Sequence, residues 1–192
     1  MVRIKPKGLF LFLMILGVDK LHKLVNTKKL VEGLCDRELD NPEGAGFDLR
    51  LGEIYELKGQ GFLGIDERKT PAVKLLAKYD EVKKKSFVFA PGRYYAMKTI
   101  EKVNTPGDIL ILFRPRSTLY RSGIALFTGN ASPGYCGELT FGIVNLGPHP
   151  IKIELGARVA HAMFYKVEGK TNLYRGQWKG GRVNAKKKEK QV

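Results

Sequence analysis

From Phe47 onward, turn-forming residues divide the chain into short apolar stretches, and this spacing limits the folds it can adopt. Phe47, Leu49 and Leu51 alternate with charged residues, as a half-buried strand requires. Later stretches recur at the roughly 8–12-residue spacing that is typical of a sandwich, jelly roll or barrel. The sequence contains no alternation of strands with helices and no internal repeat. It therefore predicts an all-β domain.

Individual elements follow from periodicity and turn signals. Apolar positions at helical spacing predict one amphipathic helix over residues 19–34, which Asp19 could cap. The segment 59–85 is charged and contains glycines, so we expect a loop there with a short strand or turn. Residues 172–182 are polar, aromatic and Gly-rich and predict a mobile arm rather than a strand. Strands are expected at 47–51, 54–57, 86–90, 94–100, 109–113, 138–145, 151–154 and 157–167.

The N-terminus imitates a signal peptide, because basic residues precede an apolar run at 9–16. That run is shorter than the ~20 residues needed to span a bilayer, and no small-residue cleavage site follows it. We interpret residues 1–13 as an extension or an over-called start, with Met14 as the alternative start. The two cysteines, Cys35 and Cys136, form neither a disulfide framework nor a zinc pattern. A cytoplasmic location, where thiols stay reduced, fits best.

The formal net charge of +15 implies attraction to polyanions: nucleic acids, nucleotides or acidic membrane surfaces. Lysine runs at 83–85 and 186–190 account for part of this charge as solvated surface of the kind common in thermophiles. No interleaving of basic and aromatic residues and no helix-turn-helix signal accompanies the charge. We therefore expect a nucleotide partner and require neither nucleic acid nor a membrane.

The segment 109–135 carries the clearest chemical signal. Its first apolar run ends in the sequence Arg114-Pro115-Arg116-Ser117-Thr118. Two arginines with two adjacent hydroxyls suit an oxyanion, because a guanidinium fork matches phosphate oxygens and hydroxyl and backbone N–H groups add donors. An ordinary basic strand end is the alternative, and the density of donors favours phosphate.

Other polar residues are weaker signals when taken alone. Asp48 lies within an apolar alternation, so we expect it to face away from the core, either solvated or near a phosphate-bound Mg²⁺. Arg158 and His161 are three residues apart on an expected strand, which predicts opposite faces. The sequence has no histidine cluster for a metal, no catalytic triad and no glycine-rich phosphate loop. Phosphate would therefore be bound from strand ends and loops.

Taken in order, five segments resemble the dUTPase and dCTP deaminase superfamily, especially the short archaeal dUTPases built on the deaminase pattern. The resemblance runs from about residue 14 to about residue 183. It implies a dUTPase-like β domain over residues 14–171, a distorted jelly roll with a short N-terminal helix. Residues 172–192 would be a Gly-rich closing arm and a basic tail. It also implies a homotrimer with sites at subunit interfaces, and Mg²⁺ as cofactor. The matching segments are 45–49, 116–119, 132–139, 156–161 and 174–182.

The same resemblance assigns roles to residues. The phosphates would be gripped by Arg116, Ser117 and Thr118, with Asp48 near Mg²⁺ through water. The backbone of the Gly129-Asn130 hairpin would read the pyrimidine edge, and Tyr135 would pack on the deoxyribose. The arm would close over the triphosphate and exclude water other than the nucleophile. The further substrate-binding residues implied are Arg121, Arg158, His161, Tyr174, Gln177 and Lys179, and the catalytic candidates are Ser132 and Glu138.

The sequence departs from the superfamily pattern at two positions that matter. Deaminases carry a glutamate for proton transfer where this chain has Gly142, which disfavours deamination. The family's third motif has an aspartate that orients the attacking water where this chain has Ser132. Serine can position water but is a poor base, and losing a positioned base typically costs about 10²–10⁴-fold in rate. His161 replaces the usual glutamine, which is a mild change because both can donate to phosphate.

Three functions follow from this pattern. The first is Mg²⁺-dependent hydrolysis of dUTP to dUMP and pyrophosphate, with Glu138 as a substitute base or with slow turnover. The second is a non-catalytic deoxynucleotide-binding homologue that lacks the base. The third and weaker function is dCTP deamination. Ser132 separates the first two, and Gly142 separates the first from the third.

Overall fold

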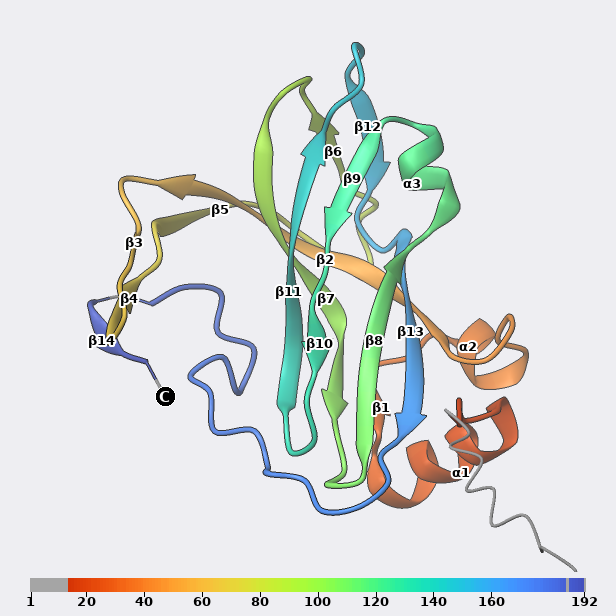
Figure 1. The fold of residues 1–192 in the computed structure, drawn as a ribbon. Coiled ribbons are helices and arrows are strands. Elements are labelled where there is room, and N and C mark those ends of the chain that lie inside the picture. The colour runs from red at the N-terminus through yellow and green to blue at the C-terminus, as the bar shows by residue number, and fades with distance from the viewer. Residues whose placement is uncertain (1–13, 186, 192) are drawn as a thin grey trace, which may run out of the picture.

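The computed structural model describes residues 14–185 and 187–191, so the expected extension at residues 1–13 lies outside the described part (Figure 1). In chain order its elements are α1 (Val18–Lys28), β1 (Val31–Glu32), α2 (Asp36–Asp40), β2 (Phe47–Lys58), β3 (Phe62–Leu63), β4 (Glu67–Lys69), β5 (Ala72–Lys78), β6 (Ser86–Phe89), β7 (Tyr94–Asn104), β8 (Ile109–Pro115), α3 (Ser117–Arg121), β9 (Ile124–Phe127), β10 (Asn130–Ala131), β11 (Cys136–Asn145), β12 (Ile151–Glu154), β13 (Arg158–Lys166) and β14 (Glu189–Lys190). No helix within the described ranges combines the length and the apolarity needed to cross a bilayer.

A nine-stranded antiparallel sheet forms the body of the molecule. Its strand order is β10-β8-β13-β2-β7-β11-β9, with β1 added to β7 and β5 added to β2. Figure 1 shows this sheet curling, with α1 and α2 at one side. Strand pairs that are far apart in sequence, such as β13 with β2, make its centre. The predicted all-β fold with a short N-terminal helix is confirmed.

The core lies inside the curl and is made largely of β-branched, leucine and aromatic side chains. Phe47, Leu49 and Leu51 are fully buried, as the alternation predicts. Asp48 between them is also buried, with 1% exposure. The alternative that Asp48 is a solvated strand residue is therefore wrong. The start of β2 is covered on both faces, and the residues that cover Asp48 are charged.

The N-terminal helix is shorter than its apolar pattern predicts. It ends at Lys28 rather than at residue 34, because Lys29 adopts a left-handed conformation with φ 51° and ψ 42°. The following apolar residue Val31 begins β1 and pairs with Val103 of β7. Gly17 rather than Asp19 takes the N-cap position. The prediction of one helix over residues 19–34 therefore merged α1 with the short strand β1, because both carry apolar residues.

The segment expected to be mostly loop, 59–85, contains β3, β4 and the seven-residue strand β5. β4 pairs with both β3 and β14 in a separate three-stranded sheet at the left of Figure 1. The chain between β13 and β14 has no regular strand through residue 185, as expected for the arm. It runs beneath the lower end of β11 before it reaches β14 (Figure 1).

Candidate functional site

Asp48 on β2 is the centre of a cluster of cationic side chains. Arg116, directly after β8, donates from Nη1 to Asp48 Oδ2. Arg158 of β13 donates to the same oxygen at 3.0 Å, and His161 Nδ1 lies 2.9 Å from Oδ1. The central strands β8, β13 and β2 are neighbours in the sheet, so their ends bring the three donors together. The cluster concentrates positive charge around one buried carboxylate.

The strand β13 places Arg158 and His161 on the same side, contrary to the prediction from their spacing. The register between β13 and β2 shifts between Arg158 and Ala160. An irregularity of this kind reorients the side chains on one side of it relative to the other. Because regular alternation breaks at that point, residues three apart can both reach Asp48.

Charge, rather than solvent, determines the protonation of Asp48. Burial alone would raise the pKa of its carboxyl group. The hydrogen bond from His161 and the positive charges of Arg116 and Arg158 outweigh burial and hold that pKa below its usual value of 3.8. Because Asp48 is ionised and accepts only, the bond to His161 requires the hydrogen on Nδ1.

The surroundings of Asp48 do not suit a direct magnesium ligand. Both carboxylate oxygens already have hydrogen-bond partners, Arg116 and Arg158 at Oδ2 and His161 at Oδ1, and Mg²⁺ prefers open carboxylates and water. Within residues 14–185 and 187–191, no three His, Cys, Asp or Glu side chains gather as a metal site would require. The expected contact between Asp48 and Mg²⁺ through water stays a prediction.

Helix α2 adds two residues that the sequence analysis missed. Arg37 Nη1 lies 3.7 Å from Asp48 Oδ2. Glu38 is 1% exposed and accepts the backbone N–H of Asp48 at 2.8 Å. A charged five-residue helix gives no periodic signal in the sequence, so its buried glutamate could not be distinguished from its exposed neighbours.

The hydroxyls of the proposed phosphate receptor lie on the outside of the molecule. Ser117 and Thr118 begin α3 and are exposed, as is Arg121 at its end. Arg116 is the N-cap residue of this helix, so the strand end and the helix start meet at one point. A phosphate at Arg116 could therefore also reach the two hydroxyls.

A second group of residues surrounds a cavity of about 360 Å³ beside the turn that joins β10 to β11. Ser132 lines this cavity, and its Oγ accepts a hydrogen bond from Asn130 at 3.0 Å. Gly134 has φ 81°, which permits the tight turn that the Pro-Gly sequence predicts. The lining residues are Phe113, Gly129, Asn130, Ser132, Tyr135, Leu139, Thr140, Phe141, Tyr174, Trp178, Arg182 and Val183.

Tyr135 joins the turn to the arm. Its hydroxyl donates to Glu138 O at 2.6 Å and lies 3.3 Å from Trp178 O. Burial, with Tyr174 and Glu138 nearby, raises the pKa of Tyr135 to about 12, so the phenol stays neutral at ordinary pH. The rings of Tyr135 and Tyr174 pack edge to face with centroids 5.2 Å apart.

The arm supplies one wall of the cavity, but not with all the residues expected. Tyr174 lines it, whereas Gln177 and Lys179 do not. Trp178 and Arg182 line it and were missed, although Trp178 is the chain's only tryptophan.

Glu138 lies beneath the arm and is not among the lining residues. A Cβ added at Gly181 would meet its Oε2 at 2.0 Å, so the carboxylate faces the backbone of the arm.

Gly142 on β11 lies under an aromatic ring. A Cβ added there would be 2.1 Å from Tyr94 Oη and 2.8 Å from Tyr94 Cζ. Tyr94 is 48% exposed and pairs with Phe127 at 6.3 Å between centroids. The space that a longer side chain at residue 142 would enter is therefore taken by a phenol.

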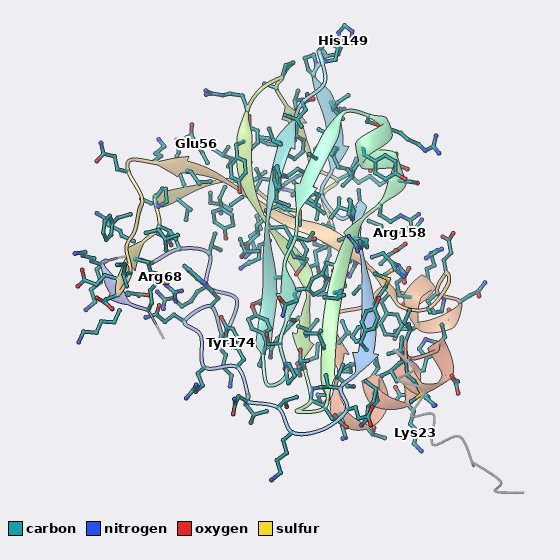
Figure 2. The ribbon with its side chains drawn as sticks, viewed as in Figure 1. Lys23, Glu56, Arg68, His149, Arg158 and Tyr174 are labelled. Carbon is teal, nitrogen blue, oxygen red and sulfur yellow. The ribbon has the colours of Figure 1, made fainter. Side chains whose placement is uncertain are left out.

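The cationic cluster and the cavity lie apart in one chain. Asn130 pairs with Leu112, and Arg116 follows four residues later, or about 13 Å along the strand at ~3.3 Å per residue. Figure 2 shows Arg158 near the upper end of β13 and Tyr174 on the arm at the opposite side. The single chain thus carries two partial sites.

Comparison with known proteins places these features in a family. Residues 15–167 match the family model described as dCTP deaminase-like. A probable deoxyuridine 5'-triphosphate nucleotidohydrolase of Archaeoglobus fulgidus is 29% identical over 171 residues, which cover 89% of this chain and 99% of that protein. A similarly named protein of Methanopyrus kandleri is 35% identical over 69% of this chain and 84% of its own length. A dCTP deaminase of Pyrobaculum islandicum is 32% identical over 88% of this chain and 93% of its own length.

A solved structure supports the fold independently. The 2'-deoxycytidine 5'-triphosphate deaminase of Agrobacterium tumefaciens superposes with a TM-score of 0.62 at 20% identity. The match covers 79% of this chain, which spans about half the length of that protein chain. At this identity the similarity concerns the fold alone.

Proposed function

Because the chain belongs to the dCTP deaminase-like family, whose named relatives include both dUTPases and dCTP deaminases, we propose that it hydrolyses dUTP to dUMP and pyrophosphate. Water would add to phosphorus, and the bond between the α- and β-phosphates would break. The pyrimidine would occupy the cavity beside Ser132, and the triphosphate would extend to a cationic cluster such as that around Asp48.

The observation that carries this choice is the composition of the cavity. None of its described lining residues is a carboxylate. Position 142 is glycine, and the ring of Tyr94 covers it. Deamination requires a group that moves protons at the amino-bearing carbon, and glycine supplies none there, whereas hydrolysis at phosphorus can proceed, more slowly than with a base, from a water held by hydrogen bonds and from donors that stabilise charge. The site therefore favours hydrolysis of a nucleotide that already lacks the amino group.

The chain's own groups would act as follows. The cluster of Arg116, Arg158 and His161 would bind negative phosphate oxygens, with Asp48 holding the donors in place. Ser132 and Asn130 would hold the attacking water by hydrogen bonds. Tyr135 would stay neutral against the sugar. The closed arm would exclude other water.

The two partial sites support a further part of the proposal, a site shared between copies of the chain. The cationic cluster begins about 13 Å along β8 from the cavity. In this part of the proposal, a second copy would bring its Arg116 to the first copy's cavity. A closed homotrimer repeats one such contact three times. This arrangement would complete three identical sites.

A second candidate function, deoxynucleotide binding without turnover, is favoured by Ser132. The described residues that line the cavity provide no alternative base, and Glu138 faces Gly181 instead. Such a protein would keep the phosphate cluster and the cavity and would release no product.

Variants at Ser132 separate these two functions. We expect purified protein to release pyrophosphate from dUTP, and we expect Ser132→Ala to reduce kcat at least about tenfold by releasing the positioned water. Ser132→Asp would increase kcat by up to about 10²–10⁴-fold, the usual contribution of a positioned base. Ser122→Ala, outside the cavity, is the matched control. Binding of dUTP without pyrophosphate release by the natural chain would refute hydrolysis and favour the binding protein.

A further inference from the structure

The Gly-rich arm is held by segments that lie outside both partial sites. On one side it covers the cavity with Trp178 and Arg182. On the other side it faces the small sheet of β3, β4 and β14. Arg68 of β4 lines no part of the cavity, yet it contacts two consecutive residues of the arm, Gln177 and Trp178.

The two contacts use two different properties of a guanidinium group, its hydrogen-bond donors and its flat, positively charged face. Arg68 Nη2 donates to Gln177 Oε1, and the same guanidinium carbon lies 5.0 Å from the centre of the Trp178 ring. Arg182 approaches the same ring at 5.8 Å. A planar cation can form a directed hydrogen bond and also pack on an aromatic ring, which lysine does less well.

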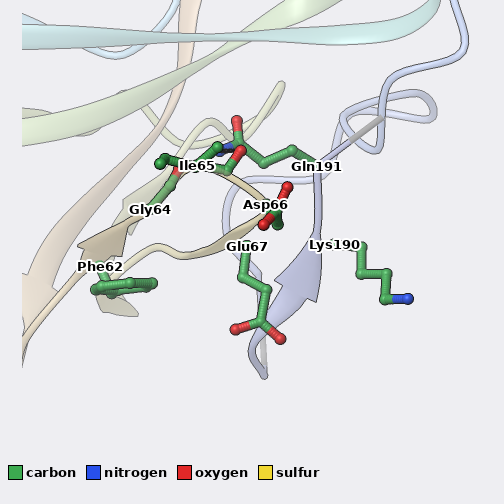
Figure 3. A pocket seen from close by; sticks show the side chains of 7 residues that line it. All are labelled: Phe62, Gly64, Ile65, Asp66, Glu67, Lys190 and Gln191. Carbon is green, nitrogen blue, oxygen red and sulfur yellow. Dashed lines mark hydrogen bonds between the residues drawn. The ribbon is translucent and has the colours of Figure 1, made fainter.

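The C-terminal strand fixes the arm at a second point. Gln177 Nε2 donates to Lys190 O at 2.9 Å, and Arg182 Nη2 to Glu189 Oε1 at 2.6 Å. The strand itself is bound to the β3–β4 hairpin, because Gln191 N donates to Asp66 O at 2.7 Å. Figure 3 shows the Gln191 side chain extending toward Ile65, while the Lys190 amino group points away from the hairpin. Hairpin, tail and arm thus form one connected unit.

We propose that Arg68 is a positioning residue that holds the closing arm over the nucleotide cavity, acting through Gln177 and Trp178. The inference rests on the proposed function, since it concerns closure of the same site. It adds that the chain's own hairpin and tail keep the arm docked before the substrate binds. Arg68 itself touches no nucleotide.

Fluorescence of Trp178 tests this directly, because the chain has no other tryptophan. In substrate-free protein, Arg68→Ala should increase acrylamide quenching of Trp178, and Arg68→Lys should give an intermediate value. The KM for dUTP should increase about 5- to 30-fold in Arg68→Ala, while kcat changes less. Lys69→Ala, the exposed neighbour on the same strand, should match the natural chain in both measurements.

A second variant distinguishes loosening of the arm from misfolding of the Arg68 variant. Glu189→Gln weakens the bond to Arg182 and leaves both side-chain contacts of Arg68 with the arm in place, so it should also increase quenching. Far-UV circular dichroism should stay unchanged in each variant. Unchanged quenching and unchanged dUTP affinity in Arg68→Ala would overturn the inference. If no variant releases pyrophosphate, the proposed function fails, and quenching together with the Kd for dUTP still decides the role of Arg68.

Discussion

At the scale of single residues, Asp48 organises the cationic cluster. Its carboxylate is 1% exposed and accepts bonds from Arg116, Arg158 and His161. The guanidinium groups of Arg116 and Arg158, placed this close, would repel each other without it. The account therefore assigns Asp48 a structural contribution that can be measured without substrate.

Asp48→Asn should lower the free energy of unfolding by about 1–3 kcal/mol at pH 7, less than for a fully buried pair because the side chains of its partners are 24–33% exposed. The pKa of Asp48 is lowered in the folded state, so its contribution is complete above its ordinary pKa of 3.8 and is lost as pH falls through the folded-state value. Urea denaturation across this pH range checks both statements.

The control for this prediction is Asp108→Asn, which removes an exposed pair with Lys166 and should cost at most about 1 kcal/mol. An equal effect of the two substitutions at pH 7, or a difference that persists unchanged below pH 3, would contradict the assigned role of Asp48.

The sequence identified the four residues of the cationic cluster but did not predict how they contact one another. Arg116, Arg158, His161 and Asp48 were all singled out, but Asp48 was expected to face away from the core, either solvated or near Mg²⁺, and its burial was not foreseen. Its burial depends on Glu38 and on neighbouring strands, which alternation within β2 cannot reveal. Arg37 and Glu38 were missed for the same reason.

At the scale of elements, glycines determine how closely the arm approaches β11. A Cβ at Gly181 would lie 2.0 Å from Glu138 Oε2, whereas one at Gly180 would meet nothing within 4 Å. Both glycines have positive φ, 72° and 80°. Substitution by alanine therefore costs similar backbone strain at both positions, and only at Gly181 must the Glu138 side chain also move.

Gly181→Ala should increase the KM for dUTP up to about 5-fold more than Gly180→Ala does, because its methyl group displaces the Glu138 carboxylate and lies 3.1 Å from Glu138 N, so the arm packs less closely on β11. Acrylamide quenching of Trp178 should rise in the same order. Parallel kinetics and quenching on the two variants provide the measurement. Equal values for both would mean that backbone strain alone, and not the contact with Glu138, governs the arm.

The sequence predicted helices and strands correctly where their apolar residues follow a regular period and a turn signal marks each end. Strands such as β12 were placed with their observed bounds, Ile151–Glu154. The end of α1 was missed because the left-handed turn at Lys29 leaves the apolar run uninterrupted. The shift in β13 that unites Arg158 with His161 is a property of strand pairing, and no single strand records it.

At the scale of the whole molecule, the cationic cluster and the cavity lie at different parts of the sheet. The resemblance to the superfamily implied sites at subunit interfaces, and the geometry of one chain supports that proposal. Sequence periodicity could not have shown that the cluster and the cavity lie apart, because their separation depends on the pairing of β8 with β10.

Mixing two inactive variants tests the shared site. Arg116→Ala removes the phosphate grip, and Asn130→Ala weakens the cavity side. Each alone should have little activity. A working site needs an intact Arg116 from one copy and an intact Asn130 from its neighbour. Each is present in half of the copies, so random co-assembly should restore about one quarter of the natural activity. Mixed oligomers without recovered activity would show that each copy works alone.

The central claim is that this chain hydrolyses dUTP and does not deaminate dCTP. The most direct measurement incubates the purified protein with dUTP and with dCTP in separate reactions containing Mg²⁺, and quantifies pyrophosphate and ammonia in each. The account predicts pyrophosphate and dUMP from dUTP and no ammonia from dCTP. Ammonia released from dCTP would contradict the role assigned to Gly142, and the absence of pyrophosphate from dUTP would contradict the claim as a whole.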